Sequence, residues 1–312
     1  MTYSVLLLGA TGKVGHKIQK ELTLQKQHFS RVAFLLPQPN IASDEGVEHP
    51  PTILERIFGY PSDSDSYRGF EIVISAVEDE ICAEQTEYAE AAFAAGVKHF
   101  YPAEYGPNLN HPDIRDELYF ADKLALRKHI EALVQADTSL GFTYVMTGVL
   151  SDFLLESNVL GLNVDKRSAT YFGSPDARVS TTHSDDIAKF IVASLLPHHL
   201  PCLNARRHLC FAGSTLSNLS LFDAISYVLR RPLDVTYDPL DVSYENKSQP
   251  KAAGDEVRRS FRRSLGFGGF ELKEQEVAQS GREFWHEVKP KAWAQVVYEF
   301  FTSKERGSEM IK

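Results

Sequence analysis

The sequence contains few cysteines and no long hydrophobic run, and each shortage excludes a class of protein. Its three cysteines are Cys82, Cys202 and Cys210. They form neither an even disulfide set nor a close thiolate pair, which is typical of a chain from a reducing compartment. We expect these thiols to fill core space. Because no apolar stretch approaches the roughly 20 residues of a membrane span, we expect no membrane partner.

Basic residues are in the minority as well. The chain has 33 Lys and Arg against 42 Asp and Glu, a net charge of −9. Duplex nucleic acid and anionic lipid both favour a basic surface, so no nucleic-acid partner is expected. The histidines lack the paired spacing of a zinc site, and we predict no metal. The first strand pattern starts at residue 4, which leaves no room for a targeting segment and predicts a soluble, cytoplasmic protein.

The sequence does contain a glycine-rich turn near its start. The segment VLLLGATGKVG, residues 5–15, runs from a buried-strand pattern into three glycines. Gly9 permits a tight turn, Gly12 lets backbone N–H groups approach a pyrophosphate, and Gly15 lets the following helix pack close to the sheet. The N-terminus of that helix carries a partial positive charge that attracts phosphate. The alternative is a structural loop, but this context favours a dinucleotide-binding turn made of Gly9, Thr11, Gly12, Lys13, Val14 and Gly15.

Strand and helix patterns alternate along the first half of the chain. Strand patterns cover residues 4–8, 31–36, 70–77, a segment from 98, and 142–150. Helical patterns cover 15–24, 80–95 and 121–136, and a later one covers 217–229. Alternation of this kind predicts an α/β fold with a doubly wound, parallel sheet and a ligand crevice at the carboxyl ends of its strands.

Four longer segments carry a family resemblance. They are KHFYPAEYGP at 98–107, YFADKLALRKHIEAL at 119–133, FTYVMTGVLSDF at 142–153 and HSDDIAKFIVASLL at 183–196. Their order and spacing, with two residues between the first two glycines, resemble the NmrA-like, isoflavone-reductase-like family of atypical short-chain dehydrogenases. The resemblance covers residues 4–196.

The resemblance implies a domain division and an activity. It implies a Rossmann domain over residues 1–154 that binds NAD(P), and a smaller C-terminal substrate-binding lobe over 155–312 that is partly interleaved with it. The implied activity is NADP(H)-dependent reduction of an aromatic or conjugated small molecule, in specialised metabolism. Some members of the family bind the nucleotide without turnover.

Lys123 and Tyr119 are the catalytic candidates. Lys123 stands where family members carry a lysine, and such a group can bind the nicotinamide ribose and help to move a proton. Tyr119 precedes it by four residues, so both side chains are expected on one helix face. An ammonium beside a phenol favours the phenolate, which makes Tyr119 a usable proton donor. The alternatives are a solvated lysine and a spacing that arose by chance.

Two departures from the family pattern affect the predicted reaction and the predicted cofactor. Ala103 stands where relatives carry a serine, so a hydroxyl that could orient a substrate carbonyl is missing. After the second strand the chain reads LPQP at 36–39, without the arginine that grips a ribose 2′-phosphate and without an acidic residue for the 2′-hydroxyl. Lys13 could reach a phosphate. We expect NADP(H) rather than NAD(H).

The remaining site residues follow other strands. Cofactor contacts are expected from Ser75, Ala76, Val77, Pro102, Ala103, Gly148, Val149 and Leu150. Substrate contacts are expected from Glu104, Tyr105 and Phe153, although Phe153 is equally compatible with core packing. The cluster of His183, Asp185 and Asp186 resembles a catalytic group, but aspartates at a helix start are explained by capping, and we expect a structural role.

Three functions are compatible with these features. The first is the NADP(H)-dependent reductase. The second is an enzyme that binds the cofactor and catalyses a non-redox cyclisation or isomerisation, which the Ala103 departure suggests. The third is a dinucleotide-sensing regulator without turnover, against which the presence of Tyr119 and Lys123 counts.

Overall fold

The structure is a computed structural model that describes residues 2–38, 54–240 and 253–309. The chain folds into two compact units. The first contains Met1–Glu104, Asp122–Val145 and Ile187–Leu209, and the second contains Tyr105–Ala121, Met146–Asp186 and Cys210–Lys312. The functional boundary expected at residue 154 stays a prediction.

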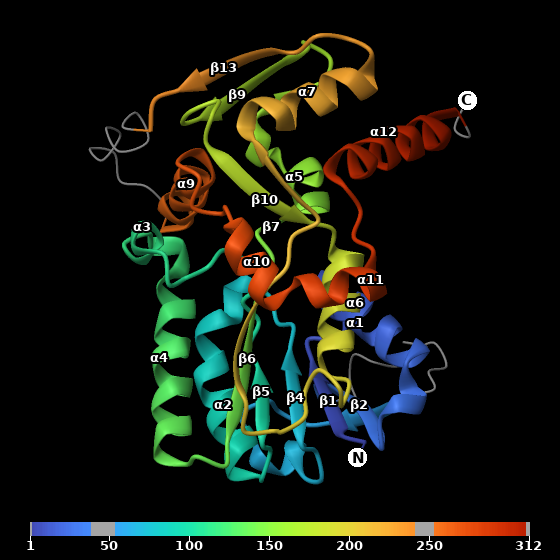
Figure 1. Ribbon diagram of the computed structural model, residues 1–312, viewed down its shortest axis with the longest axis vertical. Helices are drawn as coiled ribbons and strands as arrows, with labels where there is room; N and C mark the ends of the chain where they lie inside the picture. The colour runs from blue at the N-terminus through green and yellow to red at the C-terminus, as the bar shows by residue number, and fades with distance from the viewer. Residues whose placement is uncertain (1, 39–53, 241–252, 310–312) are drawn as a thin grey trace. The chain divides into compact units, whose positions relative to one another are not determined.

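A seven-stranded sheet forms the centre of the first unit (Figure 1). In spatial order its strands are β11 (Arg206–Cys210), β6 (Gly141–Met146), β5 (His99–Tyr101), β4 (Ile72–Ser75), β1 (Ser4–Leu8), β2 (Arg31–Leu36) and β3 (Glu55–Phe58). Neighbours from β6 to β3 all pair in parallel. The expected α/β, Rossmann-type, doubly wound sheet is therefore confirmed.

Helices cover both faces of this sheet, with α2 and α4 on one face and α1 and α6 on the other (Figure 1). The helices are α1 (Lys13–Leu24), α2 (Gln85–Ala94), α4 (Ala121–Ala136) and α6 (Ser184–Ser194), and 3-10 turns occupy Lys26–His28, Ser64–Tyr67 and Asp79–Glu84. Leu6 and Leu8 of β1 share one buried cluster with Ala89 of α2 and Ile130 of α4. Burial on both faces explains why β1, which is buried along its whole length, is apolar from Val5 to Leu8.

The strand order places a switch point between β1 and β4. The chain proceeds from β1 to β2 and β3 on one side, then continues from β4 to β5 and β6 on the other. Crevices at the carboxyl ends of strands open at such a point, because the connecting segments leave in opposite directions. Ser75 ends β4 and Leu8 ends β1, so the residues that follow them flank this crevice.

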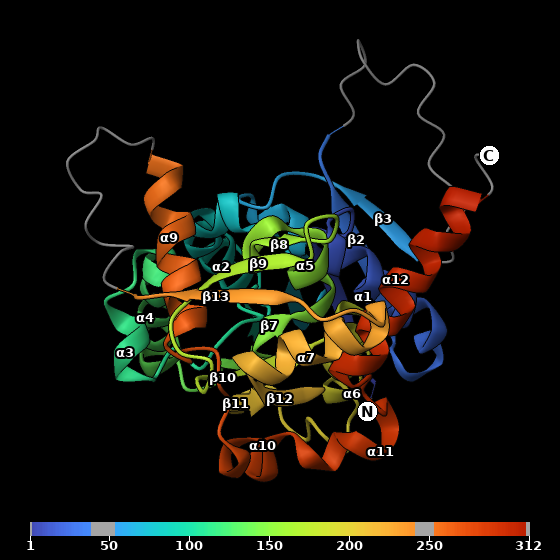
Figure 2. The same cartoon turned by 90° about the horizontal axis from the view of Figure 1, so that it is seen from above.

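The second unit contains two smaller sheets. One has the order β12 (Ser214–Ser217), β10 (Arg178–Thr182) and β7 (Val149–Leu150), and the other has the order β13 (Asp234–Asp238), β9 (Ser168–Phe172) and β8 (Leu162–Asn163). Figure 2 shows β9 and β13 side by side, as their parallel pairing requires.

Short helices make up most of the rest of this unit. They are α3 (Pro112–Arg115), α5 (Ser151–Glu156), α7 (Asn218–Leu229), α9 (Ala253–Gly266), α10 (Glu274–Ser280), α11 (Trp285–Val288) and α12 (Trp293–Glu309), and 3-10 turns occupy η4 (Leu118–Phe120), η5 (Asn158–Leu160) and η7 (Arg282–Phe284). The helix predicted over 217–229 is confirmed as α7. In the described part of the chain, no helix combines the length and hydropathy needed to cross a membrane.

The strands depart from expectation in two places. The strand expected over 142–150 is two strands, because β6 ends at Met146 and β7 belongs to another sheet. Gly148 between them has a φ of +66°, and a Cβ there would lie 2.1 Å from the carbonyl oxygen of Ser180. The sequence also gave no indication of β3, because its residues, Glu55–Phe58, contain two charged side chains in only four positions.

The cysteines also differ in part from expectation. All three are free, and Cys82 and Cys210 are buried as expected. Cys202 is exposed, so the expectation that it fills core space is wrong. It lies between α6 and β11, where the connecting segment runs over the surface.

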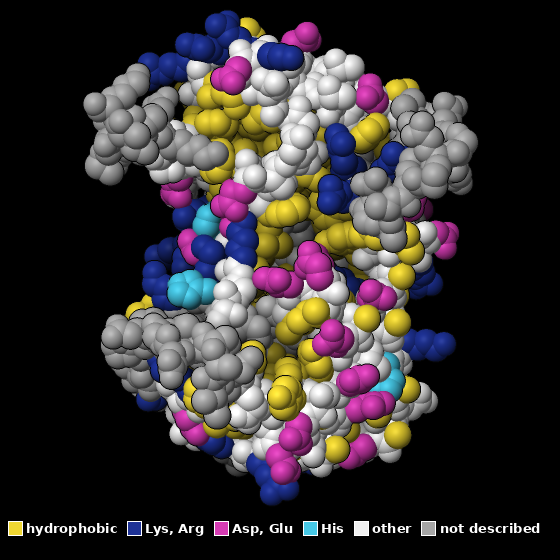
Figure 3. All heavy atoms as spheres, turned by 180° about the vertical axis from the view of Figure 1, so that it is seen from behind, with side chains coloured by type: hydrophobic (Ala, Val, Ile, Leu, Met, Phe, Trp, Pro, Cys, Tyr) yellow, Lys and Arg dark blue, Asp and Glu magenta, His cyan; other side chains and the backbone are white. Residues whose placement is uncertain are grey.

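Acidic side chains gather on the face of the first unit that is visible in Figure 3. Exposed carboxylates on α2 and the turn before it include Glu80, Glu84, Glu87 and Glu90. A surface of this sign repels polyanions. The expected absence of a nucleic-acid partner stays a prediction.

His99 ties β5 to its surroundings through a buried network. Its Nδ1 lies 2.6 Å from the carbonyl oxygen of Leu203, and its Nε2 lies 2.7 Å from the hydroxyl of Thr143. Because a carbonyl only accepts, Nδ1 carries the proton, and the Thr143 hydroxyl donates to Nε2 while accepting from Arg207 Nε at 3.0 Å. Burial lowers the pKa of His99 from 6.5 to about 3. The imidazole is therefore neutral in the folded protein.

This network makes the stability of the fold depend on pH. Below pH 6.5 the unfolded chain takes up a proton at His99 that the folded chain does not, so the free energy of unfolding falls as the pH drops toward 3. The slope should approach about 1.4 kcal/mol per pH unit. Urea unfolding of the natural protein and of His99→Gln, between about pH 7 and about pH 5, measures the difference. Equal slopes for the two proteins would contradict this assignment.

Candidate active site

The glycine turn after β1 is closely packed against β4. Gly9 has a φ of +73°, and a Cβ on it would lie 2.5 Å from the carbonyl oxygen of Ala76. A Cβ on Gly15 would lie 1.9 Å from the carbonyl oxygen of Gly9. Neither position accepts a larger residue, because the obstacle in each case is backbone. The expected tight turn and close helix packing are both confirmed.

Gly12 is enclosed less tightly than Gly9 and Gly15, although a Cβ there would still press against backbone. Its φ is −71°, which any residue adopts, and a Cβ on it would lie 3.3 Å from the carbonyl oxygen of Gly9. The absence of a side chain at Gly12 therefore leaves space that a ligand would use. An exposed carboxylate, that of Glu78, comes within 3.8 Å of this Cβ position, so an anion entering here needs that side chain to turn away.

The head of α1 suits an anion in other respects. Within the described residues, no side chain makes a capping hydrogen bond at the start of α1, and the first turn of this helix contains no acidic residue. No residue of α1 itself therefore neutralises the partial positive charge of the helix N-terminus, and the nearby carboxylate is that of Glu78. Thr11 and Lys13 are exposed beside it, and Val14 is half-buried.

The ends of β4 and β5 complete the wall of the crevice in the first unit. Ala76 donates its backbone N–H to the carbonyl of Leu8 at 3.0 Å, which holds the end of β4 against β1. Ser75 is fully buried and Val77 is half-buried. After β5, Ala103 is buried and donates its backbone N–H to Gln85 at 2.8 Å.

The glycine turn is thus brought together with Ser75, Ala76 and Val77. Pro102, which is buried, and Ala103 follow the next strand of the sheet. For the segment after β2, Pro37 and Gln38 are exposed, while Pro39 lies outside the described residues.

Lys123 is a buried cation on the first turn of α4. Its side chain is 9% exposed, and its Nζ lies 2.8 Å from Oδ1 of Asp79. The same ammonium donates to the backbone carbonyl of Glu104 at 3.2 Å. Asp79 follows the carboxyl end of β4, and Glu104 follows that of β5. Lys123 is therefore held at the carboxyl ends of these two strands. The alternative of a solvated surface lysine is wrong.

The side chain of Glu104 holds the end of β5 against α4. Its carboxylate accepts from Arg127 Nε at 2.8 and 2.9 Å and from Nη2 at 2.6 Å. Both side chains are at most 5% exposed. The Arg127 guanidinium also lies over the ring of Tyr144, 4.4 Å from its centroid. Glu104 thus joins Lys123 through its carbonyl and Arg127 through its carboxylate, which makes it a positioning residue of the first unit.

Tyr119 belongs to the second unit and precedes α4. It lies in η4, and α4 begins only at Ala121. The expected i, i+4 arrangement with Lys123 assumed one continuous α-helix, and that assumption is wrong. The pairing of the two side chains stays a prediction, because Lys123 belongs to the first unit.

Tyr119 is part of an aromatic group in the second unit. The centroid of its ring lies 4.9 Å from that of Phe120 and 4.8 Å from that of Phe261. Phe153 meets Phe261 edge-on at 5.9 Å, and Phe270 packs on both Phe120 and Phe261. Phe153 is 38% exposed while Phe120 is fully buried. The aromatic group, Tyr119, Phe120, Phe153, Phe261 and Phe270, therefore has a buried base and an accessible rim.

The other site residues expected in the second unit lie where two backbone segments, 105–106 and 147–150, are hydrogen-bonded to each other. The N–H groups of Thr147 and Gly148 both donate to the carbonyl of Gly106, at 2.9 and 3.0 Å. Val149 is buried and Leu150 half-buried in β7, and Tyr105 is half-buried. Residues 105–106 and 147–150 are thereby brought together.

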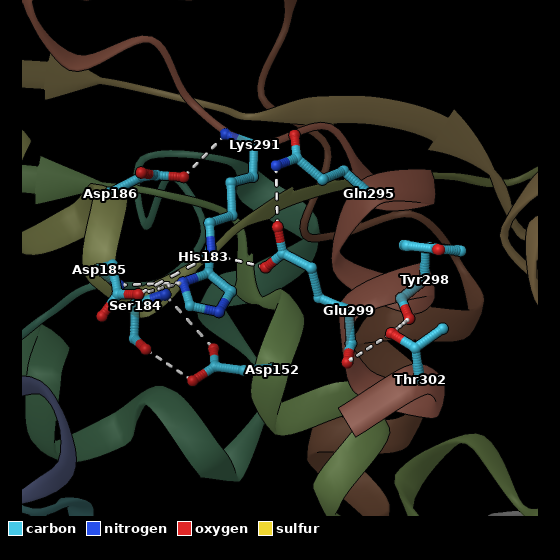
Figure 4. Close-up of polar contacts among 10 residues, drawn as sticks. All are labelled: Asp152, His183, Ser184, Asp185, Asp186, Lys291, Gln295, Tyr298, Glu299 and Thr302. Carbon is cyan, nitrogen blue, oxygen red and sulfur yellow. Dashed lines mark hydrogen bonds and ion pairs between the residues drawn. The ribbon is translucent and has the colours of Figure 1, made fainter. Parts of the chain in front are cut away.

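The charged cluster at the start of α6 has a structural explanation (Figure 4). Asp152 accepts from the Ser184 hydroxyl at 2.6 Å and from its backbone N–H at 3.3 Å. His183 Nδ1 accepts from the backbone N–H of Asp185 at 3.2 Å. The side chains that satisfy the first helical donors are therefore Asp152 and His183, rather than the aspartates that the sequence indicated.

Asp186 connects this helix start to the segment before α12. Its Oδ2 accepts from the backbone N–H of Lys291 at 2.8 Å. Lys291 in turn pairs with Glu299 of α12 at 2.7 Å (Figure 4). Asp186 therefore holds the segment before α12, which is a structural contact other than the helix cap that the sequence predicted.

Two residues of the candidate site were missed in the sequence. Asp79 carries a signal, because it follows the end of a crevice strand by four residues. Arg127 also carries one, because it lies four residues after Lys123 on the same helix and its charge is buried. The partner of Arg127 lies 23 residues away, and helical spacing does not reveal a pair of that kind.

Comparisons with known proteins show the family and the fold. The model of the NmrA-like family matches residues 1–296. The chain is 26% identical over 222 residues to oxidoreductase aprR of Aspergillus flavus, a match that covers 70% of this chain and 71% of that protein. It is 27% identical over 203 residues to the probable pinoresinol-lariciresinol reductase 3 of Arabidopsis thaliana, covering 61% and 62%. The solved structure described as AtPrR2 with NADP+ and (+)pinoresinol shares the fold, with a TM-score of 0.73 at 19% identity over 96% of this chain and 99% of that one.

The Glu104–Arg127 pair gives a prediction about stability. Glu104→Gln leaves a buried guanidinium without a counter-charge and should cost about 3–5 kcal/mol of the free energy of unfolding. The double variant Glu104→Gln, Arg127→Met removes both charges and should recover at least half of that loss. Urea unfolding measures each variant.

The matched control is Glu55→Gln. Glu55 also makes two hydrogen bonds to an arginine, Arg31, but the two side chains are 44% and 36% exposed. Its loss should cost no more than about 1 kcal/mol. If Glu104→Gln is no more destabilising than Glu55→Gln, the buried pair does not have the role described here.

Proposed function

Because the chain belongs to the NmrA-like family, we propose that it is an NADP(H)-dependent reductase of an aromatic or conjugated small molecule. One observation carries this proposal. A glycine turn with unused space at its centre and a buried lysine ammonium both lie at the carboxyl ends of strands in one parallel sheet. An oxidoreductase needs this combination, since one part holds a dinucleotide and the other handles a proton.

The proposed cofactor fits the residues of the turn. Backbone N–H groups at the head of α1 would hold the pyrophosphate at Gly12, where a methyl group would occupy the space. The ends of β4 and β5 would hold the two ribose groups. When bound, the reduced nicotinamide supplies a hydride. Relatives such as AtPrR2 are described with NADP+, and Lys13, exposed beside the turn, is the group in this chain that suits a 2′-phosphate.

Lys123 is the proposed catalytic residue. Asp79 and the Glu104 carbonyl keep its ammonium at the carboxyl ends of β4 and β5, where it would bind the nicotinamide ribose. Tyr119 is the proposed proton donor, since Ala103 offers no hydroxyl. The proton passes to the substrate atom that becomes negative as the hydride arrives.

The aromatic group supports the proposed substrate class. An edge-to-face set of rings with an accessible rim binds another flat ring at favourable geometry. Glu104 is proposed to act through Lys123 and Arg127, while Tyr105 and Phe153 are kept as substrate contacts. A cytoplasmic location and a role in specialised metabolism belong to the same proposal.

The test combines cofactor binding with turnover. Calorimetric titration with NADPH should show binding to the natural protein and at least about tenfold weaker binding to Gly12→Ala, whose stability should change by no more than about 1 kcal/mol. Lys123→Ala should lower the rate of NADPH oxidation with pinoresinol or related aromatic probes by about 10²- to 10⁴-fold. Lys128→Ala, an exposed lysine on the same helix, should leave the rate unchanged.

The outcomes separate the alternatives. Product formation without NADPH consumption would indicate a cyclase or isomerase. Equal affinity for NADPH and NADP+ with no turnover of any probe would indicate a regulator. Failure of the folded protein to bind either nucleotide would overturn the proposal as a whole.

A further inference from the structure

The second unit contains a cavity of about 580 Å³ that none of the expected site residues lines. It lies where β10 and β12 meet α10 and α11, the two short helices that follow one another in Figures 1 and 2. Its size is within the range of small-molecule sites. All of its lining residues belong to the second unit.

One side of this cavity is apolar. Leu272 is buried at 1% exposure and Val277 is half-buried, so together they give a hydrophobic surface. Trp285 lines the cavity with 42% of its surface exposed. An indole is usually well buried in a monomer, and an exposed one beside a cavity offers a large flat face to a ligand.

The charged lining residues are unequally satisfied. Glu271 pairs with Arg178 at 3.1 Å and also with Lys273, so two cations neutralise it. Glu274 lies in the first turn of α10, where the helix N-terminus stabilises a carboxylate. Arg282 is exposed, and no ion pair within the described ranges involves its guanidinium. Arg282 is therefore the cation at this cavity whose charge is left for a ligand.

Arg282 and Trp285 are also arranged to act together. They are three residues apart, across the join of η7 and α11. Both residues line the same cavity. A planar, two-pronged guanidinium and an exposed indole therefore line one cavity, of which one side is apolar.

We propose that this cavity binds an aromatic carboxylate, with its ring against Trp285 and its carboxylate on Arg282. Leu272 and Val277 bury the rest of the ring or its side chain. Neither the residues of the cofactor turn nor Lys123 lines this cavity, and the proposal does not depend on the reductase activity.

The test uses the two tryptophans of the chain as reporters. The full-length protein is labelled with 5-fluorotryptophan, and the fluorine resonance of Trp285 is assigned from the Trp285→Phe variant. Titration with 3-phenylpropionate should shift the Trp285 resonance, while that of Trp293, which is buried at 2% exposure, stays in place. The uncharged 3-phenylpropionamide should bind at least about tenfold more weakly, because it forms no charge-assisted bond.

Matched variants test whether Arg282 binds the carboxylate of 3-phenylpropionate. Arg282→Gln should weaken 3-phenylpropionate binding by about tenfold. Arg258→Gln, the same change at an exposed arginine of α9 that does not line the cavity, should have no effect. The shift should persist in Lys123→Ala and in the presence of NADP+, which distinguishes this site from the proposed active site.

Three results would each overturn the proposal. They are a Trp285 resonance that does not move at millimolar 3-phenylpropionate, equal binding of the acid and the amide, and equal binding to the natural protein and Arg282→Gln. None of them bears on whether the protein oxidises NADPH.

Discussion

Backbone-to-backbone packing at the head of α1 is the constraint on which the rest of the first unit depends. The position of a Cβ on Gly15 is blocked by the Gly9 carbonyl, and that on Gly9 by the Ala76 carbonyl. The first helix, the first strand and the end of β4 are therefore locked together with no side chain between them. Gly12 is enclosed less tightly than the other two, since a Cβ there would lie 3.3 Å from the Gly9 carbonyl oxygen, and this is the position at which we propose that the ligand approaches the backbone.

A second constraint acts through Glu104. Its carboxylate is buried on Arg127 and its carbonyl accepts from Lys123. A buried charge pair is costly to break, since either partner alone is left unsolvated. This cost keeps the end of β5 in one position, and Lys123 with it. Stability and the proposed chemistry are thus linked in one residue that the sequence suggested only as a substrate contact.

The fold could be predicted further than the site. Continuous apolar runs and the glycine turn were enough to predict the parallel sheet, because strands buried on both faces have few alternatives. β3 was missed because a short, charged edge strand has no such pattern. The break at Gly148 was missed because a sheet change depends on a distant neighbour, Ser180, and not on local sequence.

The candidate site was predictable only where its residues follow strands. The turn and the residues after β4 gather at the switch point, as strand ends must. The partners of Lys123 and Glu104 depend on contacts between segments that are distant in the sequence, which spacing does not reveal. Tyr119 shows the same limit, since a spacing of four residues predicted one helix and the structure begins a new one at Ala121.

The most direct measurement is hydrogen exchange of the backbone amides with and without NADPH. The account predicts slower exchange in residues 9–15 when the nucleotide is present, since those N–H groups would then donate to its phosphates, and unchanged exchange in β9 and β13. Unchanged exchange in residues 9–15 under saturating NADPH, or slowing confined to other segments, would contradict it.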